Sequence, residues 1–305
     1  MTAVLAFTEE PCLERTEAGG KGASLARMTS LGLPVPPGFV IPAGALAAAP
    51  ADGGAELLEV VRGDDRATAA GRAQTIVGAL ELPAPLRDAI VDAYAGLGAD
   101  DVPVAVRSSA CAEDSEEASF AGQQETFLHV RGAQAVLDRV RDCWASFFSE
   151  RALFYRAQKG SLEDLGMAVV VQRMVQAEVA GVLFTCDPVR KRSDRMVVEA
   201  VLGLGEAVVS GAVTPDHYVL KRDGTVRKAQ VHRQPYAIVS VPEGGVAERE
   251  LAEEEGSAQK VADEVLAELA RIGDDLERRL ARPQDIEWAI EGGRIFVLQA
   301  RPVTA

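Results

Sequence analysis

The chain has 305 residues, of which 48% are apolar and 26% charged, and its formal net charge is −14. A chain of this size and composition buries a substantial core and is long enough for one large or two medium domains. The acidic balance argues against binding nucleic acid through its phosphate backbone, because that mode needs a basic surface. No stretch approaches the roughly 18 apolar residues of a membrane span, and residues 1–10 lack the features of a signal peptide, so we expect a cytoplasmic protein.

The cysteines are widely scattered along the chain. They are Cys12, Cys111, Cys143 and Cys186. Since no CxxC pair occurs, the spacing indicates neither a zinc site nor a disulfide framework, and we predict reduced structural thiols.

Helical and strand-like patterns alternate along the chain. Residues 22–31 carry apolar side chains at helix-like spacing after the pair Gly19 and Gly20, which predicts a glycine loop that leads into a helix. Further predicted elements are a helical region to about residue 101, a helix at 133–158, and strands at 102–106, 168–171, 179–184 and 196–201. The mixture predicts an α/β (α+β) fold.

The last third of the chain contains a second long helical pattern. Between residues 248 and 280 the apolar set Val261, Val265, Leu269, Ile272, Leu276 and Leu280 repeats every three to four residues, with acids between. This predicts an amphipathic helix whose acidic side faces solvent. A change to hairpin-like strands near residue 175 suggests two subdomains, 1–175 and 176–305.

Lys21 stands in the segment GGKG, at residues 19–22. Backbone amides of a glycine loop and a helix N-terminus would point at an anion there, and a phosphate suits such a site. The segment is not a Walker A loop, because Arg15 occupies the first glycine position and Gly22 replaces the Ser or Thr that contacts Mg²⁺. From this motif alone, an ordinary surface lysine in a turn remains an equal alternative.

Arg107 directly follows the predicted strand at 102–106. Its guanidinium is therefore expected at a strand end, where it can clamp phosphate oxygens. An ion pair with the acids at positions 113–117 is the alternative reading.

Two segments have a loop-like composition. Residues 119–126 include Gly122, Gln123 and Thr126 and allow a mobile flap over a ligand, although an ordinary turn explains them as well. The segment GLGEAV at 203–208 has valine at the third glycine position of a dinucleotide fingerprint, so we predict a tight strand-to-helix loop near the site instead.

The C-terminal segments 285–290 and 294–301 predict a β-hairpin. A three-residue loop at 291–293 would place Asp285, Glu287, Gln299 and Arg301 on one face, opposite Trp288 and Leu298, whereas a two-residue turn would separate them. On one face, Glu287 and Gln299 would offer hard oxygen ligands to Mg²⁺, and Arg301 would face the phosphates. A solvent-facing hairpin with ordinary polar residues is the alternative.

A collinear set of motifs runs through almost the whole chain. The set comprises GGKGASLARM, PVPPGFV, VAVRSSACAED, ASFAGQQETFLHV, VVVQRMV, AGVLFTCDP, EAVLGLGEAVVSG, TPDHYVL, DIEWAI and FVLQARPVT. Together these segments resemble the N-terminal ATP-binding domain shared by phosphoenolpyruvate synthase, pyruvate phosphate dikinase and rifampicin phosphotransferase. The resemblance implies an ATP-grasp fold, in which two subdomains hold the nucleotide in the cleft between them.

The same resemblance implies roles for particular residues. Lys21 and Arg107 would contact ATP phosphates, and the loop with Gly122, Gln123 and Thr126 would close over them. Gln172, Arg173, Met174 and Val175 would hold the adenine, Glu287 and Gln299 would bind Mg²⁺, and Asp285 and Arg301 would complete the phosphate and metal shell. Lys21, Arg107 and Arg301 are the expected catalytic residues.

Larger members of the family carry a phosphorylated histidine on a later domain. The histidines of this chain are His129, His217 and His232, and none stands in a segment that resembles the phosphohistidine motif. We therefore expect either an excised domain or a protein that phosphorylates a histidine carrier in trans or an acceptor directly.

The resemblance implies a dikinase-type phosphoryl transfer from Mg-ATP, with AMP and phosphate as products. A carboxylate–amine ligase and a non-catalytic ATP-sensing module remain alternatives. The sequence leaves open the identity of the phosphoryl acceptor.

Overall fold

The computed structural model describes residues 3–50, 52, 54–63, 65–98, 101–111, 125–158, 160–190 and 192–303. It confirms a mixed fold of helices and antiparallel sheets. The chain forms two compact units, of which unit 1 is Met1–Gly32 with Pro37–Met174 and unit 2 is Leu33–Pro36 with Val175–Ala305. The chain thus passes between the units after Gly32, Pro36 and Met174. That residues 1–175 and 176–305 act as two ATP-grasp subdomains stays a prediction.

Unit 1 is built on a five-stranded antiparallel sheet in the order β1-β2-β5-β3-β4. The strands are β1 (Leu5–Ala6), β2 (Gly38–Ile41), β3 (Val104–Ala110), β4 (Thr126–Val130) and β5 (Met167–Arg173). The helices are η1 (Glu10–Leu13), α1 (Arg15–Ser30), α2 (Gly44–Ala48), α3 (Ala55–Val61), α4 (Arg66–Gly78), α5 (Ala84–Ala95), α6 (Ala133–Ser146) and α7 (Glu150–Gln158).

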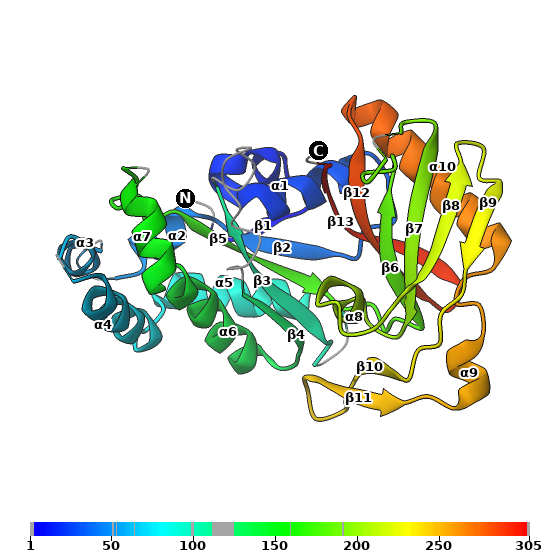
Figure 1. Cartoon of the computed structure of the whole chain (residues 1–305). Helices are drawn as coiled ribbons and strands as arrows, with labels where there is room; N and C mark the ends of the chain where they lie inside the picture. The colour runs from blue at the N-terminus through cyan, green and yellow to red at the C-terminus, as the bar shows by residue number, and fades with distance from the viewer. Residues whose placement is uncertain are drawn as a thin grey trace. The chain divides into compact units, whose positions relative to one another are not determined.

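The alternation of side chains along β3 and β5 decides which face of this sheet forms the core. Val104 and Val106 of β3 and Val169 and Val171 of β5 join one apolar cluster with buried residues of α2 to α7. The other face of the sheet carries Arg107 and lies against α1 (Figure 1). Arg107 and α1 are therefore on the side of the sheet opposite the core.

Several elements of unit 1 differ from the sequence prediction. Two helices, α6 and α7, replace the single helix predicted at 133–158, and the helical region to residue 101 also contains β2. Strand β3 extends to Ala110, beyond the predicted end at residue 106, because Ser108 and Ala110 pair with β5 as regularly as the valines before them.

Unit 2 contains a six-stranded antiparallel sheet in the order β13-β12-β6-β7-β8-β9 and a separate two-stranded sheet, β10-β11. The strands are β6 (Val179–Phe184), β7 (Arg195–Leu202), β8 (Asp216–Lys221), β9 (Val226–Gln230), β10 (Tyr236–Ser240), β11 (Val246–Glu250), β12 (Gln284–Glu291) and β13 (Arg294–Pro302). The helices are α8 (Glu206–Val209), α9 (Glu253–Ser257) and α10 (Asp263–Leu280).

Helix α10 covers one face of the six-stranded sheet and contacts β12, β6 and β9 (Figure 1). Its buried residues are Leu266, Leu269, Ala270, Gly273 and Leu276. The buried stripe is therefore rotated relative to the predicted one, because Gly273 lets the helix approach Leu183 so closely that a Cβ there would lie 2.8 Å from Leu183 Cδ2.

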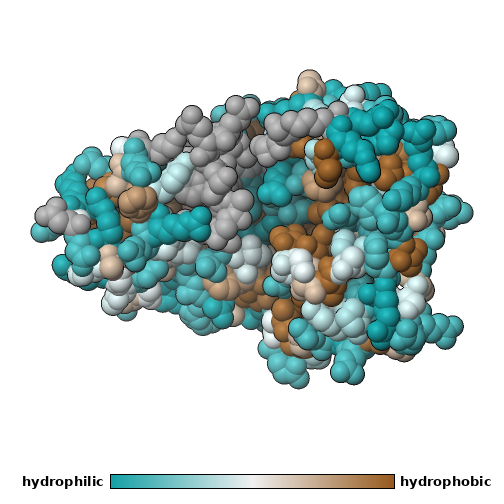
Figure 2. Space-filling model, in the orientation of Figure 1, coloured by the Kyte–Doolittle hydropathy of each residue, from teal (hydrophilic) through white to brown (hydrophobic). Residues whose placement is uncertain are grey.

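The predicted helix at 248–280 is wrong in its first part. Residues 248–250 belong to β11, and the short α9 is separated from α10. The exposed residues of α10 are mainly charged, as expected for its outer side. The face of the molecule that Figure 2 shows is mainly hydrophilic, with apolar patches among the polar side chains. Among the described residues no helix combines the length and apolar composition that crossing a membrane requires.

Candidate functional site

Gly19 interrupts helix α1 just before Lys21. Its backbone is non-helical, with φ +67° and ψ 179°. The Ser109 hydroxyl bridges the break, because it donates to Ala18 O at 2.8 Å and accepts from Gly22 N at 3.2 Å. The hydroxyl thus replaces the lost Gly22-to-Ala18 hydrogen bond of the helix. The predicted glycine loop is therefore a kink inside a longer helix, fixed to strand β3.

This kink brings Lys21 to the middle of β3. Lys21 Nζ donates to Ser108 O at 3.0 Å, next to Arg107. Arg107 pairs with Thr126 of β4 and Val170 of β5 in the sheet register. Directly opposed residues in neighbouring strands point to the same side. The predicted phosphate-contacting residues Lys21 and Arg107 and the predicted flap residue Thr126 therefore share one part of unit 1.

The sequence predicted Arg107 at the end of a strand, but the structure has it inside β3. Its position on the sheet is fixed by pairing with β4 on one side and β5 on the other. The predicted flap residues Gly122 and Gln123 lie outside the described residues.

The predicted adenine segment spans the boundary between the units. Gln172 and Arg173 end β5, and Met174 N donates to Pro103 O at 2.9 Å, all within unit 1. Val175 begins the second part of unit 2 and packs in an apolar cluster with Ala180, Ala289 and Phe296, which Ala177 and Leu298 extend.

The C-terminal hairpin carries the remaining predicted residues. Its loop is the two-residue turn Gly292-Gly293, with φ +57° and +73°, which is the shorter of the two loops that the sequence left open. Both glycines adopt the left-handed conformation that two-residue hairpin turns favour. A turn of this length would by itself place Gln299 and Glu287 on opposite faces.

A β-bulge restores the alignment. The register shifts between Glu287 and Trp288, because Glu287 pairs with Gln299 but Trp288 pairs with Val297, which leaves Leu298 as the extra residue. Asp285 consequently pairs with Arg301. The four residues Asp285, Glu287, Gln299 and Arg301 therefore share one face of the sheet, because of the bulge and not because of a three-residue loop.

The prediction that Leu298 lies opposite this face is also wrong. Leu298 packs against the cluster that contains Ala289, and Ala289 is two residues from Glu287 on the same strand, hence on the same face. Trp288 points to the other face and is 1% exposed. One side of the sheet thus combines hard oxygen donors with an adjoining apolar cluster.

The carboxyl group of Asp285 is buried on this face of the sheet. Arg301 Nε donates to Asp285 Oδ2 at 2.9 Å, and the Asp285 side chain is only 10% exposed. Burial raises the pKa of the Asp285 carboxyl, Arg301 opposes the rise, and the negative charges of Glu287 and Glu199 add to it. Asp285 Oδ1 is buried and receives no hydrogen bond from any residue that the structure describes.

These side chains fit the magnesium ion that the sequence predicted. Glu287, Gln299 and Asp285 offer hard oxygen atoms, and the unsatisfied Asp285 Oδ1 marks a place where a polar or charged partner is missing. No three His, Cys, Asp or Glu side chains within the described part of the chain are grouped so that they alone hold an ion.

Sequence reasoning missed Glu178. Its Oε1 accepts from Gly292 N at 2.8 Å, and its carbonyl accepts from Gly203 N at 2.9 Å. Glu178 therefore ties the hairpin turn to the GLGEAV loop, which connects β7 to α8 as predicted. A lone glutamate before a strand gives no sequence signal for such a role.

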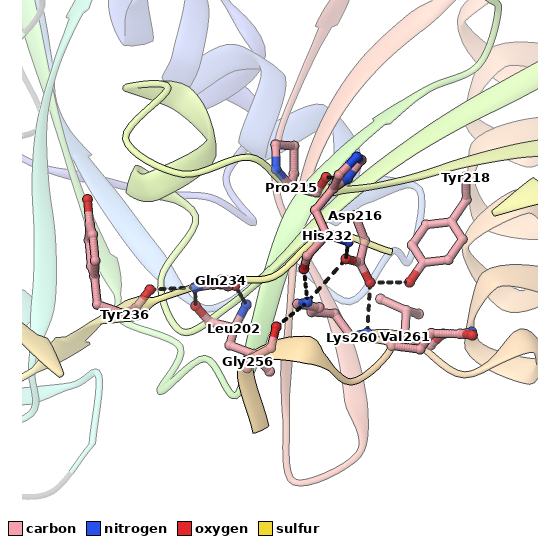
Figure 3. Close-up of polar contacts among 11 residues, drawn as sticks. Leu202, Pro215, Asp216, Tyr218, His232, Gln234, Tyr236, Gly256, Lys260 and Val261 are labelled. Carbon is pink, nitrogen blue, oxygen red and sulfur yellow. Dashed lines mark hydrogen bonds and ion pairs between the residues drawn. The ribbon is translucent and has the colours of Figure 1, made fainter. Parts of the chain in front are cut away.

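A buried polar network beyond this loop was also missed (Figure 3). Lys260 Nζ lies 3.2 Å from Asp216 Oδ1, with the two side chains 1% and 0% exposed, and donates to His232 O and Gly256 O. Tyr218 Oη donates to Asp216 Oδ2 at 2.7 Å. All three ammonium protons thus have acceptors, which explains how a charged pair is tolerated in this core.

Gln234 connects the chain near this buried network to the strand end before the GLGEAV loop (Figure 3). Its side chain accepts from Leu202 N and donates to Leu202 O and Tyr236 O. Leu202 is the last residue of β7, directly before Gly203. The network therefore fixes the strand end from which the GLGEAV loop begins.

Comparison with known proteins shows to which family the chain belongs. Residues 15–305 match the family described as the pyruvate phosphate dikinase AMP/ATP-binding domain. The chain belongs to this family. Its fold is accordingly of the ATP-grasp type, as predicted, and AMP/ATP binding is the property that the family's description states.

Three curated relatives show where the pyruvate phosphate dikinase AMP/ATP-binding domain occurs. A probable phosphoenolpyruvate synthase of Methanocaldococcus jannaschii is 42% identical over 94% of this chain and 25% of that protein. A rifampicin phosphotransferase of Bacillus cereus is 35% identical over 99% of this chain and 36% of that protein. The prodigiosin synthesizing transferase PigC of Serratia marcescens is 39% identical over 99% of this chain and 33% of that protein. The chain thus spans about a quarter to a third of these relatives.

Proposed function

We propose that this chain binds Mg-ATP and transfers a phosphoryl group, either to a histidine carrier in trans or directly to a small-molecule acceptor, with AMP and phosphate as products. The observation that carries the proposal is the arrangement of Asp285, Glu287, Gln299 and Arg301 on one face, in a chain that matches an AMP/ATP-binding family from residue 15 to residue 305. The relatives' names describe transferases and synthases with different products, so the acceptor is not specified by this domain.

Each residue has a role that its chemistry supports. Glu287 and Gln299 would hold Mg²⁺, which when bound neutralises phosphate charge and orients the triphosphate. Lys21 and Arg107 of unit 1 and Arg301 of unit 2 would bind phosphate oxygens and stabilise the charge that develops during transfer. Thr126, with Gly122 and Gln123, would close over the phosphates.

The apolar cluster around Val175 supports an adenine site. Val175, Ala180, Ala289 and Phe296 provide a buried apolar surface on the face that carries Glu287. An adenine ring needs such a surface, and a triphosphate extending from it needs the polar residues beside it. Gln172, Arg173 and Met174 would complete the adenine contacts.

The direct test is identification of nucleotide products after incubation with Mg-ATP and candidate acceptors, including a phosphohistidine-domain protein. We expect AMP, and we expect Lys21→Ala and Glu287→Gln each to reduce turnover by about 100-fold or more. Glu248→Gln, on the exposed strand β11, is the matched control and should retain full turnover. Unaltered turnover in both site variants would contradict the assignment.

Nucleotide products other than AMP, or no product at all, would favour one of the alternative functions. ADP as the sole nucleotide product indicates a simple kinase, and ADP that appears only with a carboxylate plus an amine indicates a ligase. Tight ATP binding without product under every acceptor condition indicates an ATP-sensing module.

A further inference from the structure

The segment that leads into β6 is held to the C-terminal hairpin by hydrogen bonds in both directions. Gln176 N donates to Glu291 Oε1 at 2.7 Å. In return, Gly292 N donates to Glu178 Oε1 at 2.8 Å. Glu178 N also donates to Ile290 O at 2.9 Å. Each of the two segments therefore supplies one carboxylate to a backbone N–H of the other.

These two carboxylates set the path of the backbone more than the overall stability of unit 2. A backbone N–H binds a carboxylate more strongly than it binds a neutral oxygen. Glu178 is exposed and Glu291 is partly exposed, so water competes for each contact and the net gain in stability is modest. The hydrogen bonds nevertheless fix residues 176–178 against the hairpin turn, and with them the backbone that leads out of Val175.

Val175 lies directly before this fixed stretch and has an unused backbone donor. Among the residues that the structure describes, none accepts a hydrogen bond from Val175 N. Val175 is 4% exposed and packs in the apolar cluster with Ala180, Ala289 and Phe296. Buried backbone N–H groups are nearly always paired. A donor of this kind beside an apolar surface suits a flat heteroaromatic ring that carries an acceptor nitrogen.

We propose that Glu178 and Glu291 are positioning residues, which hold the backbone beside Val175 so that the Val175 N–H selects adenine over other purine bases. The inference rests on the proposed function and deepens it, because it names the residues that set the base preference. N1 of adenine is an acceptor, whereas N1 of hypoxanthine carries a hydrogen and is a donor. A rigidly placed N–H therefore favours adenine, since two opposed donors leave both groups unpaired.

The test compares the Kd of ATP with that of ITP, which has the same ribose and phosphates but hypoxanthine as its base. Calorimetry on the full chain with Mg²⁺ gives the Kd of ATP, and competition against ATP gives that of ITP. We expect the wild type to prefer ATP. Glu291→Ala and Glu178→Ala should each weaken ATP binding by about fivefold and leave ITP binding within about twofold, because ITP does not use the positioned N–H.

Two kinds of control accompany these variants. Glu291→Gln and Glu178→Gln keep an oxygen that can accept the same hydrogen bond, so they should retain most of the preference for ATP. Glu248→Ala makes the same truncation on exposed strand β11 and should leave both Kd values unchanged. Hydrogen exchange of the Gln176 amide should become faster in Glu291→Ala than in the wild type, while the unfolding midpoint shows that the variant is folded.

Three results would overturn the inference. They are a wild type that binds ATP and ITP equally, alanine variants that keep the wild-type preference, and alanine variants that lose affinity for both nucleotides to the same extent. The last result would indicate a purely structural role. Each of them leaves the proposed function intact, because ATP still binds to the wild type. Failure of the proposed function would look different, since neither nucleotide would then bind.

Discussion

Gly19 is the residue on which the position of Lys21 depends. A Cβ at this position would lie 2.1 Å from Ser109 O and 2.3 Å from Ser109 Oγ, and φ is +67°. Gly19→Ala should therefore destabilise the protein by about 3 kcal/mol or more, because backbone strain adds to a clash with backbone atoms. Chemical denaturation monitored by circular dichroism measures this change.

Gly71→Ala is the control for that prediction. Gly71 lies inside α4, and a Cβ there would meet nothing within 4 Å. Alanine should stabilise this helix by roughly 0.5–1 kcal/mol. Equal effects of the two substitutions would show that the Gly19 kink is not required by the packing against Ser109.

Asp285 is expected to lower the stability of the fold when it is ionised, and we propose that it also takes part in Mg-ATP binding. Burial is the main cause that raises its folded-state pKa above 3.8, so the fold disfavours the ionised carboxyl. The contribution of Asp285 to stability is fully present below the unfolded-state pKa and is lost as the pH rises through the folded-state pKa. Asp285→Asn should therefore gain thermal stability relative to the wild type as the pH rises from 3.8, while it weakens Mg-ATP binding.

Asp223 is a control, because its pKa shifts in the direction opposite to that of Asp285. Hydrogen bonds from Thr225 lower the pKa of the Asp223 carboxyl. Its contribution is present above the unfolded-state pKa and lost as the pH falls through the folded-state value. Asp223→Asn should consequently lose stability at neutral pH, and the loss should vanish in acid. Melting curves from pH 3 to pH 8 compare both variants, and parallel profiles would refute the assigned directions.

At the scale of elements, the C-terminal hairpin shows what the sequence can and cannot predict. The pattern of residues 285–301 predicted both strands, and it gave a shared face of Glu287 and Gln299 only for a three-residue loop. It did not predict the register of the two strands, because the register depends on two features together. The Gly292-Gly293 turn would place Glu287 and Gln299 on opposite faces, and the extra residue Leu298 returns them to the same face. The Gly292-Gly293 pair is a local signal for a two-residue turn, whereas the position of the bulge at Leu298 depends on pairing and packing that local sequence does not encode.

The Asp216–Lys260 network lay beyond prediction for a different reason. Its two charged residues are 44 positions apart, and each looks like an ordinary polar residue in the sequence. Only the fold brings β8 and the segment before α10 together. The strands at 179–184 and 196–201 were predicted from their apolar runs, because burial of the sheet requires those side chains, whereas β8 was not predicted.

This network should contribute strongly to the stability of unit 2. Lys260→Met leaves the buried Asp216 carboxylate without its cationic partner, which should cost about 3–5 kcal/mol. Lys221→Met on the same strand as Asp216 is the control, since Lys221 is exposed and should change stability by less than about 0.5 kcal/mol. Urea denaturation compares the two variants, and a loss below about 1 kcal/mol in Lys260→Met would contradict the structural role.

At the scale of the molecule, the predicted nucleotide site is divided between the two units. Lys21, Arg107 and Thr126 belong to unit 1, whereas Glu287, Gln299 and Arg301 belong to unit 2. The proposal that all of them bind one nucleotide therefore predicts that the ligand stabilises both units. A ligand held by one unit alone would stabilise only that unit.

The two tryptophans of the chain allow each unit to be followed separately. Trp144 on α6 and Trp288 on β12 are both buried, one in each unit. In Trp288→Phe and Trp144→Phe, the remaining tryptophan reports the unfolding of its own unit by fluorescence. Mg-ATP at about 100 times its Kd should stabilise by about 2.7 kcal/mol and raise both transitions, because either unit must release the shared ligand when it unfolds. Lys21→Ala in either background should reduce both shifts, and a shift confined to Trp288 would restrict nucleotide binding to unit 2.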